Sequence, residues 1–179
     1  MDSRKVYFKG RGEMVSALEA DMEDFIPRIR AREVEEIQGL NNMDVDEAVR
    51  FSYKMSHKKF SYLANGKVLV MAGVADLPRN STMSGKLGAL DGKGGIPFLL
   101  STDDSTEYKF EIARRCAPIL FKEIKEGYDF LTIWTADNMT ELYKLASHGG
   151  FRAIEIAKHP VTNAVYKRLA WYRHWKEVR

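Results

Sequence analysis

The side chains that most often bind metals or act as nucleophiles are few in this chain and far apart. Its four histidines, His57, His148, His159 and His174, do not have the spacing of metal ligands, and no HExxH motif is present. The single cysteine, Cys116, lies among apolar residues in a helical pattern, which favours a core position over a nucleophile. A Gly-x-Ser-x-Gly motif is also absent. We therefore expect no metal site and no serine or cysteine nucleophile.

A glycine-rich stretch at residues 88–94 superficially resembles a phosphate-binding loop. Such a loop needs four residues between its glycines, a serine or threonine after the lysine, and a helix directly afterwards. Here only three residues separate Gly88 from Gly92, a glycine follows Lys93, and a strand is expected next. The stretch is more typical of a surface loop.

The C-terminal residues combine positive charge with aromatic rings. From Lys158 to Arg179 the chain has six basic residues and one acidic residue, whereas the rest is close to neutral. Such a pattern can bind nucleic acid through phosphate pairing and base stacking. The favoured interpretation is a terminal strand and helix whose aromatic residues pack on the core while the charges stay in water, because such tails are common. The candidate nucleic-acid or partner contacts are Lys167, Arg168, Trp171, Arg173, Trp175 and Lys176.

Length and composition limit the class of protein. With 179 residues, 45% hydrophobic and 30% charged, the chain can bury a core without disulfides and is neither disordered nor low in complexity. No apolar run is long enough to span a bilayer, and the first residues lack a secretory signal. One cysteine fits a reducing compartment. We expect a protein made in the cytoplasm.

The N-terminal half predicts two helices followed by strands. Residues 1–20 show no clear period and suggest an arm. Apolar residues recur at helical spacing over residues 25–40, with a break near Pro27, and a second helix over residues 44–55 begins at the capping pattern of Asp44 and Glu47. Asn65-Gly66 between two β-rich runs predicts a hairpin over residues 60–74.

The C-terminal half alternates strands and helices. Expected strands cover residues 96–100, 130–134, 151–156 and 164–169, expected helices cover residues 105–126 and 139–147, and residues 78–95 form a loop. Pro118 should kink or break the first of these helices. The order predicts an α+β (mixed α/β) fold, a central mixed sheet flanked by helices. We divide the chain into an arm (1–20), a domain (21–158), and a C-terminal strand with a basic aromatic tail (159–179).

The order of elements resembles that of the GNAT N-acetyltransferase fold. Three stretches also look like the small internal virion proteins of T7-like short-tailed bacteriophages. They are Arg32–Ile37 with Asp46–Val49, Lys67–Val74 followed by Ile96–Asp103, and Asp129–Phe151. The resemblance covers roughly residues 22–157. It implies a virion location, with the host cytoplasm during assembly, and other phage proteins and DNA as partners.

The resemblance also bears on catalysis. GNAT enzymes have a glycine-rich turn after the fourth strand, where backbone amides bind the pyrophosphate of acetyl-CoA. The matching stretch here is Thr102, Asp103, Asp104, Ser105 and Thr106, followed by Glu107. It has no glycine and three carboxylates. Carboxylates that face a pyrophosphate would oppose its binding, so we expect no cofactor and interpret this degenerate loop as a helix cap.

The family's other functional positions are only partly matched. Asn138 fits the asparagine at the end of the fifth strand. Tyr143 is near the position of the tyrosine that protonates the thiolate, although the count from Asn138 falls on Leu145. Asp76, at the end of a central strand, is the nearest candidate general base. For Tyr143 and Asp76 the favoured interpretation is structural, as a packing aromatic ring and as a solvated carboxylate at a strand end.

The leading interpretation is a non-catalytic bacteriophage internal virion or assembly protein with a GNAT-like fold. One alternative is an acyltransferase that uses acetyl-CoA and binds this donor through unusual contacts, for instance from Lys86 or Lys93. An open cleft between the fourth and fifth strands would favour it, whereas a cleft filled by Trp134 would not. The other alternative is a nucleic-acid-binding module that acts through the basic tail.

Overall fold

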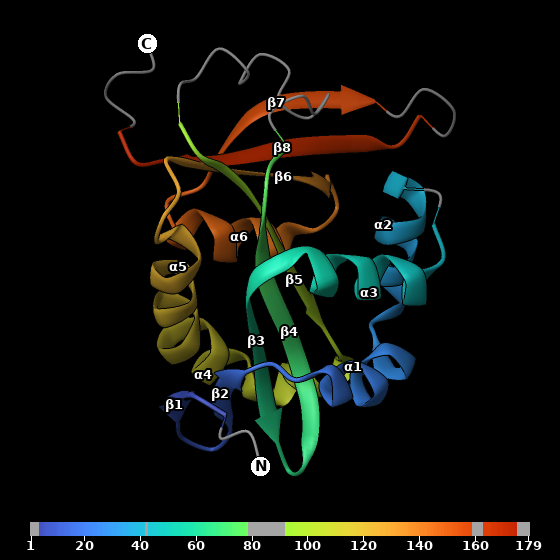
Figure 1. The fold of residues 1–179 in the computed structure, drawn as a ribbon. Helices are drawn as coiled ribbons and strands as arrows, with labels where there is room; N and C mark the ends of the chain where they lie inside the picture. Colours follow the sequence, from blue (N-terminus) through green and yellow to red (C-terminus); the bar gives the residue numbers. More distant parts are fainter. Residues whose placement is uncertain (1–3, 42, 79–91, 159–162, 175–179) are drawn as a thin grey trace.

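The backbone forms one mixed sheet with helices on both faces (Figure 1). The structure, a computed structural model, describes residues 4–41, 43–78, 92–158 and 163–174. Its strands, in the sheet order β1-β2-β3-β4-β5-β6-β8-β7, are antiparallel except for the parallel pair β5 and β6. The strands are β1 (Val6–Lys9), β2 (Glu13–Ser16), β3 (Ser56–Ala64), β4 (Lys67–Asp76), β5 (Gly94–Ser101), β6 (Phe130–Ala136), β7 (Arg152–Lys158) and β8 (Val165–Tyr172). The expected mixed α/β fold is confirmed.

The helices divide between the two faces of the sheet. They are α1 (Glu19–Phe25), α2 (Ala31–Asn41), α3 (Val45–Met55), α4 (Lys109–Glu111), α5 (Ala117–Lys125) and α6 (Thr140–His148). On one face, Met22 and Phe25 of α1 pack against Met71 of β4. On the other face, Leu120 and Ile124 of α5 belong to the largest core cluster. Neighbouring residues of a strand therefore serve opposite layers.

Local signals in the sequence account for several boundaries. The side chain of Asp44 accepts hydrogen bonds from the N–H groups of Asp46 and Glu47 and so caps α3. Asn65 and Gly66 have φ angles of 51° and 72°, which is the left-handed conformation that a two-residue hairpin turn requires. Both predictions are confirmed.

The region expected as one helix over residues 105–126 is instead built from four segments. A 3₁₀ helix (Asp103–Tyr108) leads into the single turn of α4, a π-helical turn follows (Ile112–Cys116), and α5 begins with Pro118 in its first turn. Proline has no N–H and its ring displaces the carbonyl four residues earlier, so regular α-helical bonding cannot pass through it. The predicted break at Pro118 is confirmed.

The terminal segments belong to the sheet more fully than the sequence suggests. Residues predicted as an N-terminal arm form the hairpin β1–β2, and β2 pairs with β3. The predicted C-terminal segment contributes β8, which pairs with both β6 and β7. The arm is therefore corrected to an edge strand, β1, and its neighbour β2, and the last strand, β8, is an interior strand of the sheet.

The parallel strands β5 and β6 separate soon after they start. They pair only at Gly94 with Phe130 and at Gly95 with Leu131. A Cβ on Gly94 would lie 2.4 Å from the ring of Phe130, so the close approach needs glycine there. Beyond this point the two strands diverge, which leaves a gap in the middle of the sheet.

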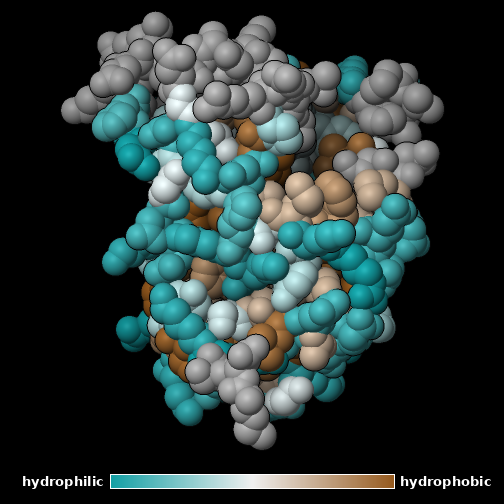
Figure 2. Space-filling view, viewed as in Figure 1, coloured by the Kyte–Doolittle hydropathy of each residue, from teal (hydrophilic) through white to brown (hydrophobic). Residues whose placement is uncertain are grey.

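Two further sequence expectations concern the surface and the cysteine. In the described part of the chain, no helix has the length and apolar character needed to span a bilayer. In the view of Figure 2, hydrophilic residues cover most of the described surface, with hydrophobic residues between them in small groups. Cys116 is buried, and burial raises the pKa of its thiol to about 12, which agrees with the predicted core position.

Candidate functional site

A cavity of about 350 Å³ opens where β5 and β6 have separated. Its floor includes Val70, Leu99 and Ser101, on β4 and β5. One wall is the segment from Ser105 to Ala113, and the other is α6. The cavity therefore lies against the carboxyl end of β5, which is where open α/β sheets commonly bind ligands. We call it the cleft.

Four cationic side chains line the cleft. They are Arg30, Arg32, Lys109 and Lys144, and the carboxylates that line it are those of Glu33 and Glu141. Glu141 pairs with Arg32 at 2.5 Å, and this arginine lowers the pKa of Glu141. The lining thus carries an excess of positive charge, which attracts anionic ligands.

Arg30 is held rigidly at the base of the cleft. Its guanidinium donates hydrogen bonds to the carbonyl of Thr102 and to the hydroxyls of Ser105 and Thr106, at 2.8 to 3.1 Å. Only 13% of its side chain is exposed. This positioned cation next to two hydroxyls is a preorganised site for an anion.

Of the acidic residues of the degenerate loop, two pair with cations outside the cleft and one lies beside a cation that lines it. Asp104 lies 3.6 Å from Lys67, and Glu107 pairs with Arg11 at 2.8 Å. The carboxylate of Asp103 is 89% exposed and lies 3.6 Å from the guanidinium of Arg30. The lining of the cleft contains Ser105 and Thr106 from this segment but none of these carboxylates. The predicted electrostatic barrier to a bound pyrophosphate therefore stays a prediction, and of the three carboxylates only that of Asp103 lies beside a cation of the cleft.

Two backbone amides of the same turn are engaged within the protein. The N–H of Thr102 donates to the carbonyl of Leu69, and that of Ser105 donates to the carbonyl of Thr102. The N–H of Ser101 donates to Glu33 at 2.6 Å. These three amides are therefore not available to an anion, whereas the cationic and hydroxyl side chains of the lining are positioned to bind one.

Helix α2 braces the separated strands with two carboxylates. Glu33 accepts hydrogen bonds from the N–H and the hydroxyl of Ser101 on β5, both at 2.6 Å. Glu36, one turn later, accepts from the N–H of Ala136 at 2.6 Å and from the hydroxyl of Thr135 on β6. Burial raises the pKa of both carboxyl groups. These contacts replace strand pairing that the divergence removes.

Between Gly95, where pairing with β6 ends, and Ser101, where Glu33 binds, β5 presents an unpaired edge to the gap. The N–H of Thr102 points to β4 and that of Ser101 points to Glu33, so odd-numbered residues of β5 direct their N–H groups towards β6. Pro97 has no N–H to offer. Leu99 therefore directs its N–H and carbonyl towards the gap, where an extended ligand could pair with them.

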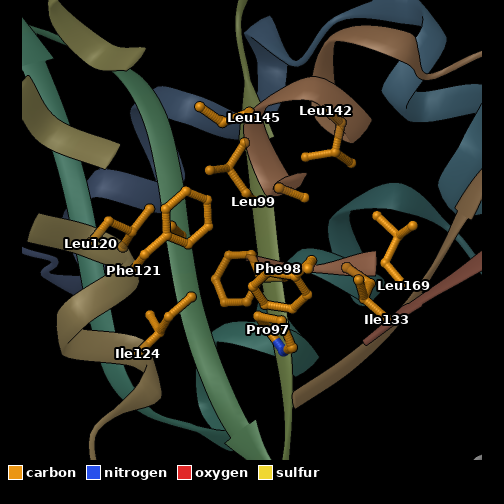
Figure 3. Close-up of a pocket in the computed structure, with 13 residues that line it drawn as sticks. Pro97, Phe98, Leu99, Leu120, Phe121, Ile124, Ile133, Leu142, Leu145 and Leu169 are labelled. Atoms are coloured by element: carbon orange, nitrogen blue, oxygen red, sulfur yellow. The ribbon is translucent and has the colours of Figure 1, made fainter. Parts of the chain in front are cut away.

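A small apolar chamber adjoins the cleft. Its volume is about 40 Å³, and it shares Leu99, Leu142 and Leu145 with the cleft. Figure 3 shows Phe121 from α5 and Phe98 from β5 among the side chains that converge on it. The chamber is lined almost entirely by carbon, so it suits a short apolar group.

Asp76, the predicted candidate base, lies at the opposite end of the sheet. It pairs with Gly95 in the register of β4 and β5, whereas the cleft residue Ser101 pairs with Val70. Six residues of strand correspond to about 20 Å. Burial acts to raise the pKa of Asp76, but hydrogen bonds from Lys93 and Tyr128 outweigh it and lower that pKa. The structure does not bring this carboxylate to the cleft.

The other predicted positions also lie outside the cleft. Tyr143 lines a different surface hollow, and its ring packs under Lys167 at 5.5 Å. Asn138 is exposed, and its carbonyl accepts from the N–H of Thr140. Trp134 does not line the cleft but packs against the guanidinium of Arg168. The cleft is therefore open. Lys93 contacts Asp76, and Lys86 lies outside the described residues.

Internal contacts engage much of the basic C-terminal segment. Lys167 pairs with Asp137 at 2.5 Å, and Arg168 is buried and hydrogen-bonded to Thr132. Arg173 donates to the carbonyl of Tyr128 at 2.7 Å. Trp171 is half-buried, with the ammonium of Lys125 4.9 Å from its ring centroid. Trp175 and Lys176 lie outside the described residues. Binding of nucleic acid by this segment stays a prediction.

Sequence reasoning missed the four cations of the cleft. Arg30 stands at the end of the predicted helix break, Arg32 lies in the first turn of α2, and Lys109 and Lys144 occur on two other helices. No local motif joins these positions, because the fold alone brings them together. Within the described ranges, no group of three or more potential metal ligands occurs.

Comparison with known proteins identifies the fold. No family model and no curated protein sequence matches the chain. Among solved structures, a GCN5-related N-acetyltransferase from Kribbella flavida has a TM-score of 0.62 and 18% identity, covering 90% of this chain and 98% of that one. The ribosomal-protein-S18-alanine N-acetyltransferase from Escherichia coli has a TM-score of 0.59 and 14% identity, covering 90% and 93%. An N-acetyltransferase from Staphylococcus aureus has a TM-score of 0.60 and 12% identity, covering 90% and 98%.

These likenesses show that the chain has a GNAT-like fold. The three structures just named are those of acetyltransferases. The cleft is also open, and its lining contains none of the three carboxylates of the degenerate loop. The leading interpretation from the sequence, a non-catalytic bacteriophage virion protein, is therefore wrong. The partners and virion location inferred with it stay predictions.

Proposed function

We propose that the protein is an N-acyltransferase that takes its acyl group from an acyl-CoA bound in the cleft. The observation that carries this proposal is an open cleft at the divergence of two parallel strands, lined by four cations. Coenzyme A is a polyanion, so an excess of positive charge at the cleft favours it.

The residues of the cleft fit the three parts of such a donor. Arg30 with the hydroxyls of Ser105 and Thr106 would hold a phosphate group. The open edge at Leu99 would pair with the amides of the extended pantetheine arm. The apolar chamber beyond Leu99 would receive a short acyl chain. In the reaction, an amine nitrogen forms a bond to the thioester carbon, the carbon–sulfur bond breaks, and the amine proton is finally taken up by the thiolate or solvent.

Calorimetric titration with acetyl-CoA tests donor binding. We expect wild-type binding that weakens as salt rises, because cations near the surface are screened. Lys109→Glu and Lys144→Glu reverse charges at exposed positions of the lining. At an intermediate effective dielectric, each reversal should lower the affinity about tenfold or more. Lys54→Glu on α3, exposed and outside the lining, is the matched control.

Transfer itself is tested by thiol release from acetyl-CoA in the presence of amine and peptide acceptors. The single cysteine will interfere little with a thiol-specific reagent, because its thiol is buried. Absence of acetyl-CoA binding by the wild type would overturn the proposal. It would also be overturned if Lys54→Glu weakened binding as much as Lys109→Glu does.

A further inference from the structure

An aromatic ring separates the apolar chamber from a hollow on the surface of the protein. The chamber has a volume of about 40 Å³, and the second space, which we call the outer hollow, has about 320 Å³ and lies between α5 and the end of α6. Phe121 is the one described residue that lines both spaces. Its ring, which Figure 3 shows beside the chamber, therefore forms the wall between them.

Two neighbours hold this ring in place. A Cβ on Gly149 would lie 2.8 Å from three carbons of the Phe121 ring, so the backbone can pack there only because Gly149 has no side chain. The ring centroid of Phe151 is 6.0 Å from that of Phe121. Phe151 lines the chamber and the hollow beside Tyr143, and it is buried, whereas Phe121 is half-buried. Phe121 is therefore the less enclosed of the two rings.

The chamber has room for about three carbon atoms. A cavity needs about 10–15 Å³ to hold one water molecule, and a methyl group is of similar size. A volume of about 40 Å³ thus fits the carbons that follow the carbonyl in an acetyl, propionyl or butyryl group. A longer chain would meet the ring of Phe121. The outer hollow, on the other side of this ring, is lined in part by Ala113, Ala117 and Pro118, which suit further apolar chain.

We propose that Phe121 determines the length of the acyl chain, because its ring closes the chamber after about three carbons. The proposal deepens the proposed function and rests on it for the identity of the donor as an acyl-CoA. It names the class of donor as the CoA thioesters of short straight chains, from acetyl to butyryl. Removal of the ring would join the chamber to the outer hollow and admit longer chains.

The test compares acetyl-, butyryl-, hexanoyl- and octanoyl-CoA. Each is titrated by calorimetry into the full-length wild type, Phe121→Ala and Phe121→Leu. The affinity for octanoyl-CoA is divided by the affinity for acetyl-CoA in the same protein, so that a general weakening of donor binding cancels. Phe51→Ala is the matched control, because Phe51 is 57% exposed on α3 and lines neither space.

The expected result is a change in chain-length preference. Each methylene that moves from water into an apolar space strengthens binding about fourfold. Wild-type affinity should therefore rise from acetyl-CoA to butyryl-CoA and fall for octanoyl-CoA. In Phe121→Ala the octanoyl-to-acetyl ratio should be at least about tenfold higher than in the wild type. Phe121→Leu should show a smaller rise, which keeps the test decisive if the alanine variant does not fold.

The same titrations can overturn the assignment. Wild-type affinity that keeps rising through octanoyl-CoA would do so, as would equal ratios in the Phe121 variants and Phe51→Ala. A rise in Phe151→Ala alone would also overturn it. In each of these cases, binding of acetyl-CoA by the wild type would leave the proposed function standing. If the wild type bound none of the acyl-CoAs, both proposals would fail.

Discussion

Replacement of Glu33 tests whether its carboxylate braces the divided sheet. Glu33 is 4% exposed and accepts two hydrogen bonds of 2.6 Å from Ser101. Glu33→Ala removes both acceptors and leaves the N–H of Ser101 buried without a partner. Each lost hydrogen bond to a charged acceptor corresponds to about 1.5–3 kcal/mol, and removal of a buried charge offsets part of this. We expect the free energy of unfolding to fall by about 3 kcal/mol.

Glu33→Gln is the matched variant, because the amide can replace both interactions. Its carbonyl oxygen can accept from the N–H of Ser101, and its NH₂ can donate to the Ser101 hydroxyl. We expect its stability at pH 7 to stay within about 1 kcal/mol of wild type. For a chain of this size, the alanine variant should melt about 6–12 °C lower. Urea denaturation followed by circular dichroism measures all three proteins.

The pH dependence of stability provides the second half of this test. Burial raises the pKa of Glu33 above its ordinary value of 4.5, so the folded state favours the protonated carboxyl. The stabilisation from this group is complete below about pH 4.5 and is lost as the pH rises through the raised value. The glutamine variant should therefore gain stability relative to wild type across that window. Equal stability of the alanine and glutamine variants, or a difference between wild type and the glutamine variant that does not vary with pH, would refute the brace.

Three further predictions concern residues on and away from the cleft. Tyr143→Phe should leave acyl transfer within about twofold of wild type, because the ring lies outside the cleft; a loss of about a hundredfold would restore the tyrosine as a general acid. Cys116 should react with a thiol reagent only on unfolding, since burial raises its pKa to about 12, and fast labelling of the native protein would contradict this. Gly94→Ala should lower the free energy of unfolding by about 1–3 kcal/mol, because its Cβ would meet the ring of Phe130. Urea denaturation measures this change, and unchanged stability would show that β5 and β6 can move apart without cost.

Much of the fold could be predicted because local chemistry specifies it. A helix cap at Asp44, a left-handed turn at Asn65-Gly66 and a break at Pro118 each depend on residues close together in the chain. The hairpin β1–β2 could not be recognised in the same way. Its strands have four residues each, and pairing with β3 supplies the partner that so short a segment needs.

The candidate site was harder to predict, because the sequence does not show which way its side chains point in the folded chain. The sequence shows carboxylates at Asp103 and Asp104, and only the 3₁₀ turn decides that they face solvent and basic partners. It likewise shows Glu33 and Glu36 as ordinary residues of an amphipathic helix. Their contact with two different strands follows from the divergence of those strands, which no local pattern indicates.

The junction of two residue pairs between β5 and β6 has a mechanical consequence. Tension applied to the strands β1 and β8 would pass through every strand between them. The pairing of β5 with β6 at Gly94 and Gly95 involves the fewest residue pairs and is therefore the weakest connection. A molecule stretched in this way should tear there first, into a five-stranded piece and a three-stranded piece. A ligand that contacts both β5 and β6 would link the two pieces and raise the force needed to separate them.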